Sequence, residues 1–188
     1  MKLSLACVTC FLLILCHAVL GQDVKKVQEP EYLGIFFLLD ASTGNLIPLE
    51  RQTPQYNLKA KAMGLGGVKS LLEIKGEKSP IRFKEGQQLE FVVLIPSQQT
   101  DPQGILQFFS LESLKGKRQL ILAKEGLTSA GPKSVVSSKA VPFNAAKYGT
   151  SSFKITSAQN LSPGEYVLST TSTNDGFCFG IDPANPNQ

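Results

Sequence analysis

Apolar residues of this chain come in short runs from residue 31 onward, separated by glycine, proline, asparagine, aspartate and serine. The runs recur at intervals of about ten residues, which is typical of a β-sandwich or a β-barrel. No stretch has a convincing helical period. The pattern therefore predicts a single all-β domain over residues 31–182. Residues 22–30 are expected to form a flexible N-terminal segment, and residues 183–188 a frayed tail.

Turn residues and alternation place about ten strands along the domain. The run at 31–40 is the first strand, and Pro48 marks 46–50 as an edge strand because proline cannot donate to a ladder. Residues 57–63 alternate Leu58, Ala60 and Ala62 with lysine, which favours a strand with one dry face over a helix. The apolar run at 91–95 is expected to be buried on both faces. Residues 105–126 are expected to form a hairpin around a turn at 115–116.

The N-terminus has the pattern of a secretory signal peptide. One basic residue, Lys2, precedes a long apolar run without acids, and cleavage after Gly21 would leave Gln22 as the new N-terminus. The alternatives are an uncleaved membrane anchor and a lipidated cysteine. Lipidation is disfavoured because Cys16 follows Leu15 instead of a small residue, and Cys7 has almost no apolar segment before it. We therefore expect residues 1–21 to be removed and the protein to be secreted or periplasmic, without stable membrane insertion.

Signal cleavage changes the chemistry of the chain more than its size. Cys7, Cys10, Cys16 and His17 leave with the signal, so the mature chain has no histidine and one cysteine, Cys178. An intramolecular disulfide, a Ser-His-Asp triad, a Cys-His pair and a histidine-ligated zinc site are then excluded. No cofactor is expected.

The charge balance is mild. The whole chain carries a net charge of +4, and the mature chain about +3 because Lys2 is lost. The one dense basic run, Lys115 to Arg118, is expected to be a solvated hairpin tip rather than a nucleic-acid site. No nucleic-acid partner is predicted.

The segment "LSPGEY" resembles the tyrosine corner of Greek-key sandwiches such as fibronectin type III and immunoglobulin domains. In that motif a tyrosine near the start of the penultimate strand bonds a backbone group a few residues upstream. Here Leu161 would plug the core, Pro163 and Gly164 would form the turn, and Tyr166 would begin the strand. One residue separates Gly164 from Tyr166, where the common fibronectin pattern has two. The resemblance implies an immunoglobulin-like Greek-key sandwich, with a barrel as the alternative.

A broader resemblance links the chain to exported bacterial β-rich proteins of unknown function. It implies an exported β domain and no particular activity. The matching positions are Asp40, Gly44, Leu46, Leu49, Glu50, Pro163, Gly164, Glu165, Tyr166, Phe177, Phe179, Gly180 and Asp182.

Acidic residues offer the remaining catalytic possibility. Two carboxylates across a cleft could hydrolyse a glycosidic bond, and Asp40 and Asp182, at the ends of the first and last strands, are the pair to inspect. The simpler expectation is that both cap turns. Asp101 and Asp175 stand alone in their loops and do not indicate a calcium site.

The last strand carries the one cysteine of the mature chain. Phe177 and Phe179 alternate with Cys178, so the rings should face the core and the thiol the opposite side. Burial of Cys178 is favoured, and a free reactive thiol is the alternative.

Taken together, the signal pattern and the lack of an assembled catalytic group predict an exported, non-catalytic binding or structural module whose partner is a protein or a surface ligand. The alternatives are a carboxylate-dependent carbohydrate-active enzyme and a carrier of lipid or another small molecule.

Overall fold

A computed structural model describes residues 27–60, 67–125 and 133–184 of the chain. The expected signal peptide, its cleavage position at Gly21 and Gln22, and residues 185–188 lie outside the described residues. Among the helices that are described, none is long and apolar enough to cross a membrane.

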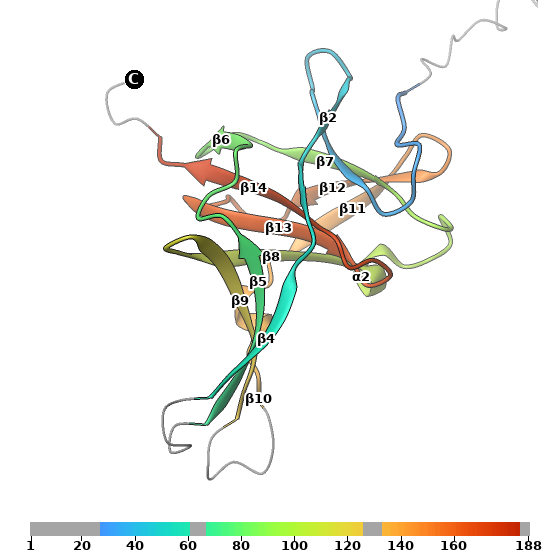
Figure 1. Cartoon of the computed structure of the whole chain (residues 1–188). Helices are drawn as coiled ribbons and strands as arrows, with labels where there is room; N and C mark the ends of the chain where they lie inside the picture. The colour runs from blue at the N-terminus through green and yellow to red at the C-terminus, as the bar shows by residue number, and fades with distance from the viewer. Residues whose placement is uncertain (1–26, 61–66, 126–132, 185–188) are drawn as a thin grey trace, which may run out of the picture.

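The protein is an all-β sandwich of two almost entirely antiparallel sheets (Figure 1). Within the described residues it has fourteen strands, of which ten are at least four residues long. The five-stranded sheet has the order β11 (Phe143–Tyr148), β12 (Ser152–Ser157), β7 (Glu90–Leu94), β1 (Phe36–Leu39) and β2 (Leu46–Pro48).

The other sheet has nine strands. Its main path is β3 (Glu50–Gln52), β14 (Gly176–Asp182), β13 (Gly164–Thr170), β8 (Leu106–Leu114), β9 (Lys117–Glu125), β5 (Val68–Lys75) and β4 (Gln55–Ala60). The two-residue strand β10 (Lys133–Ser134) pairs with β9, and β6 (Arg82–Lys84) pairs with β14 in parallel. A one-turn helix, α2 (Pro102–Ile105), is capped by Asp101, and a 3₁₀ turn, η3 (Val136–Lys139), precedes β11.

An aromatic cluster fills the space between the two sheets. The Phe91 and Phe179 ring centroids lie 4.9 Å apart, and Tyr166 stacks on Phe179 at 5.5 Å. Phe36 packs on Phe177 at 5.5 Å. Because successive side chains of a strand alternate between faces, Phe177 and Phe179 both enter this core from β14. These rings hold the two sheets together by burying large apolar areas.

The nine-stranded sheet also buries part of its other face, because it curls strongly. Its two end strands, β3 and β4, are consecutive in the chain and are separated only by Thr53 and Pro54. Pro54 has no backbone N–H, so pairing is interrupted where the chain passes from one edge of the sheet to the other. The curl packs Ile74, Leu111 and Leu120 into a second, smaller apolar core.

Two expectations from the sequence are wrong in detail. Residues 55–60 do form a strand, but its apolar face is not dry, since the Leu58 side chain is 77% exposed. Arg118 is not part of a solvated tip. Lys115 and Gly116 form the exposed hairpin turn, whereas Arg118, two residues further on, is fully buried.

Candidate ligand-binding site

The concave face of the nine-stranded sheet forms an open trough between β4 and the β13–β14 connection. Directly paired residues share a face of a sheet, and the register pairs Tyr56 with Leu72, Leu72 with Leu120, and Phe109 with Val167. All five side chains therefore project to the concave side. The trough has a volume of about 400 Å³.

The floor of the trough is apolar, and the wall formed by β4 is exposed to solvent. Leu120 and Val167 are buried at the bottom, with Leu72, Phe109 and Leu122 packed against them. Tyr56 on β4 is 64% exposed above this floor, and Leu58 lies on the same face one step further along the strand. A single exposed apolar residue is ordinary, but Tyr56 and Leu58 stand together on one face of β4 and form an exposed apolar patch, the kind of surface that marks an interaction site.

The rim opposite β4 is polar and well anchored. It consists of the end of β13 and the turn before β14, which contribute hydroxyl groups. The Thr170 hydroxyl lies 3.1 Å from that of Ser172 and 3.0 Å from that of Thr173. Asp175 accepts hydrogen bonds from the Arg51 guanidinium, at 2.6 Å from Nη2, and from Thr53. Asp175, the one carboxylate among the described residues of the rim, is therefore already paired with a cation.

A buried ionic network lies beyond the trough on the same face of the sheet, since Arg118 is two residues from Leu120 on β9. Arg118 donates from Nη1 and Nη2 to the two carboxylate oxygens of Glu50, at 2.8 and 3.0 Å. Its remaining donors reach the carbonyl oxygens of Lys75 and Gly76. Glu165 lies 3.8 Å from Arg118 Nη1. The guanidinium is fully buried and has little donor capacity left for a ligand.

The network extends outward through Glu165. This carboxylate accepts from the Ser79 backbone N–H at 2.8 Å and also pairs with Arg82. Arg82 in turn donates to Asp182 at 2.6 Å. The hydrogen bond from Arg82 is the main cause that lowers the pKa of Asp182. Burial alone would raise the pKa of Glu50, but the hydrogen bonds from Arg118, Ser79 and Gln52 and the charge of Arg118 together outweigh it, so the pKa of Glu50 is lowered. The carboxylates of Glu50 and Asp182 are thus held in their ionised form.

Cys178 lies beneath this network and is fully buried, on the face opposite Phe177 and Phe179. Burial raises the pKa of its thiol to about 12, although the nearby Arg118 works in the opposite direction. A thiol with this pKa stays protonated near neutral pH and is a poor nucleophile.

Asp40 and Asp182, the carboxylate pair suggested by the sequence, bind different partners in the structure. Asp40 accepts from the backbone N–H of Ser42 at 2.9 Å and from the hydroxyls of Ser42 and Thr43, and these bonds lower its pKa to about 2. It therefore caps the β1–β2 turn. Asp182 instead forms its ion pair with Arg82. Among the described residues, no group of three or more His, Cys, Asp or Glu side chains is placed to hold a metal ion.

The segment that resembles a tyrosine corner, residues 161–166, lies at the start of β13. The Tyr166 hydroxyl donates to the Ser162 carbonyl at 2.7 Å, and Leu161 packs against the main core. Gly164, at φ 159°, opens β13 directly after Pro163. These residues support the sheet and do not line the trough.

The trough residues and Arg118 were not found from the sequence, although a signal for both existed. Tyr56 is in phase with Leu58 along β4, and Arg118 is in phase with Leu120 and Leu122 along β9. Period-two alternation therefore placed Arg118 on an apolar face, where an arginine must be paired. Its partners come from distant strands, which one sequence does not identify.

Comparison of the chain with protein-family models, with curated proteins and with solved structures finds no match.

Proposed function

We propose that this protein is an exported, non-catalytic binding protein that holds a small, largely apolar molecule in the trough. The observation that carries the proposal is the apolar floor of the trough with Tyr56, 64% exposed, above it. Leu58, 77% exposed, extends this apolar surface along β4 beyond the trough lining. The proposal combines the binding module expected from the sequence with the small-molecule carrier that was its alternative.

The size and lining of the trough support a small ligand. A volume of about 400 Å³ falls in the range of roughly 300–1,000 Å³ that is usual for ligand sites, which combine apolar walls with a few polar groups. The hydroxyls of Ser169, Thr170 and Thr173 can orient one polar end of the ligand. Because Arg51 already pairs with Asp175, a neutral polar end fits the rim better than a charged one.

The rival function is a carboxylate-dependent enzyme, which needs two acids facing each other across a cleft. Among the described residues that line the trough, Asp175 is the one acid, and it is held in an ion pair. Asp40 and Asp182 bind different partners in different places. The binding role therefore accounts for the arrangement with fewer assumptions.

Export and the finer fold class belong to the same proposal. The signal-like pattern at residues 1–21 supports a secreted or periplasmic protein. The bond from Tyr166 to Ser162 supports an immunoglobulin-like Greek-key sandwich, since such folds use a tyrosine in this way. The modest net charge supports a partner other than nucleic acid.

A fluorescence titration tests the binding role. The mature protein should bind N-phenyl-1-naphthylamine, a neutral apolar dye that brightens when it leaves water. Tyr56→Ser should weaken dye binding by about tenfold, or ~1.4 kcal/mol, because it removes the aromatic ring that would contact the dye.

Tyr32→Ser is the matched control. Tyr32 is 63% exposed, almost the same as Tyr56, but does not line the trough. The control should bind the dye like the wild type. Equal losses in the two variants, or no dye binding by the wild type, would contradict the proposal.

A further inference from the structure

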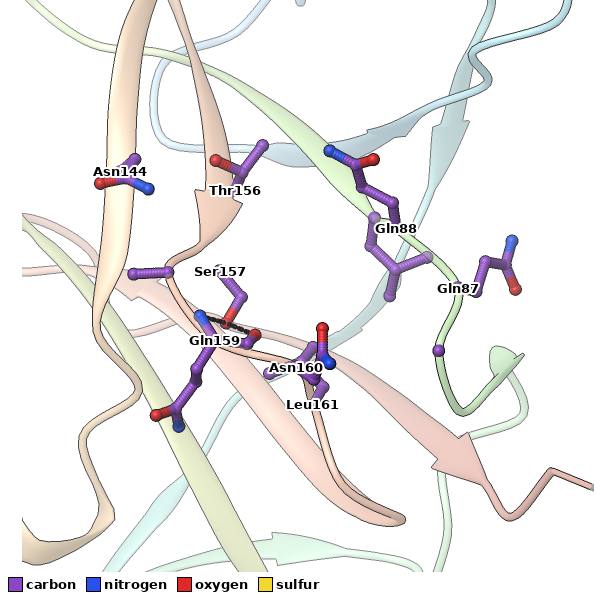
Figure 2. A pocket seen from close by; sticks show the side chains of 11 residues that line it. Gln87, Gln88, Asn144, Thr156, Ser157, Gln159, Asn160 and Leu161 are labelled. Atoms are coloured by element: carbon purple, nitrogen blue, oxygen red, sulfur yellow. Dashed lines mark hydrogen bonds between the residues drawn. The ribbon is translucent and has the colours of Figure 1, made fainter.

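A second hollow lies at one end of the five-stranded sheet, apart from the trough. It is bordered by the β6–β7 connection, by β11 and β12, and by the β12–β13 connection, and has a volume of about 420 Å³. Figure 2 shows polar side chains from these segments arranged around an open centre. The register places Asn144 directly opposite Thr156 on neighbouring strands, so both lie on the same face.

Uncharged hydrogen-bonding groups dominate the lining. Five side-chain amides take part, from Gln87, Gln88, Asn144, Gln159 and Asn160. Among the described residues, only the Gln87 amide is engaged, accepting from the Lys84 N–H at 3.3 Å. The other four amides therefore keep both donors and acceptors for a ligand.

The hydroxyl groups and the floor complete the hollow. The Ser157 hydroxyl donates to the Gln159 carbonyl at 2.7 Å and accepts from the Gln159 N–H at 3.3 Å (Figure 2), which fixes the turn that presents Asn160. Leu89 is buried and Leu161 half-buried, and together they supply an apolar patch. No ionisable side chain is among the described residues that line the hollow.

We propose that this hollow binds a neutral oligosaccharide. Sugar hydroxyls both donate and accept, which matches side-chain amides that do the same. The apolar patch of Leu89 and Leu161 suits the C–H face of a sugar ring. Among the described lining residues, an anion would find no cation and a cation would find no carboxylate. Because these residues also include no aromatic ring for stacking, the affinity should be weak, on the order of 0.1–1 mM.

Binding to an array of neutral, sulfated and sialylated oligosaccharides tests the proposal, followed by calorimetry with the strongest neutral ligand. The mature protein should bind neutral glycans, and binding should persist at high salt because no ion pair is involved. Asn144→Ala and Gln88→Ala should each weaken binding by roughly two- to tenfold, the effect of one lost neutral hydrogen bond.

Gln55→Ala is the matched control. It removes an exposed amide from β4, outside the hollow, and should leave glycan binding unchanged. Tyr56→Ser should also leave glycan binding unchanged, because Tyr56 lines the trough and not this hollow. The two binding proposals are therefore tested independently. Binding confined to charged glycans, binding of unfolded peptides in place of glycans, or absence of neutral glycan binding would each overturn the proposal.

Discussion

At the scale of single residues, Arg118 has the most demanding environment in the described structure. A fully buried guanidinium is stable only when its donors are satisfied, and here two glutamates and two backbone carbonyls surround it. The role is structural, since the network ties β9 to β3 and β13. Removing one member leaves buried charge uncompensated.

Arg118→Ala should therefore lower the free energy of unfolding by about 3–5 kcal/mol, the usual cost of breaking a buried ion pair. Urea unfolding followed by circular dichroism measures the change. Lys117→Ala is the control, because Lys117 is partly exposed and pairs with Glu73, and a pair of that kind contributes about 1 kcal/mol or less.

If Arg118→Ala does not fold at all, Arg118→Lys provides the second measurement. It keeps the charge but loses the planar fork that binds both Glu50 oxygens, so its loss of stability should fall between the other two variants. Equal stabilities of the Arg118 and Lys117 variants would show that the buried network does not stabilise the fold.

At the scale of elements, the sequence predicted the positions of most strands but not the order of the strands in the two sheets. Alternation located most strands, including the edge strand at Pro48 and the closing strand around Phe177. It did not predict that β3 and β4 form opposite ends of one curled sheet, because strand order depends on contacts distant in sequence. For the same reason the exposure of Leu58 was missed, since its alternation is the same whether the facing space is filled or empty.

The N-terminal segment is joined to the β11–β12 turn by one side chain. Glu29 accepts from the backbone N–H groups of Thr150 and Ser151, at 2.8 and 2.9 Å, and from the hydroxyls of Thr150 and Ser152. Burial alone would raise the pKa of Glu29, but these four bonds outweigh it and lower the pKa to about 2.

This lowered pKa predicts a pH dependence of stability. A carboxyl with a folded pKa below its unfolded value stabilises the fold fully above the unfolded pKa of 4.5, and that contribution is lost as the pH falls towards 2. Glu29→Gln should therefore be less stable than the wild type at pH 7 in thermal unfolding. The difference should shrink below pH 4.5 and vanish near pH 2. A difference that is constant with pH would contradict the role of the Glu29 carboxylate.

At the scale of the whole molecule, the described part of the sandwich offers hollows of different chemistry, among them the trough and the amide-lined hollow. The aromatic core holds the two sheets together, and the curl of the larger sheet adds a second apolar face that is only partly filled. The trough on that face has an apolar floor and a hydroxyl-rich rim whose carboxylate, Asp175, is paired with Arg51, while the hollow at the end of the smaller sheet is lined by amides. Each feature supports binding of uncharged molecules.

The central claim is that the trough binds an apolar ligand, and methyl NMR of the mature protein titrated with N-phenyl-1-naphthylamine tests it most directly. Resonances of Leu72, Leu122 and Val167, which line the trough, should shift in a saturable manner. Ile47 on β2 is the internal control, since it is 40% exposed but lies on the other sheet, and its resonance should stay unchanged. Shifts confined to Ile47 and other residues outside the trough, or no saturable shift at all, would contradict the claim.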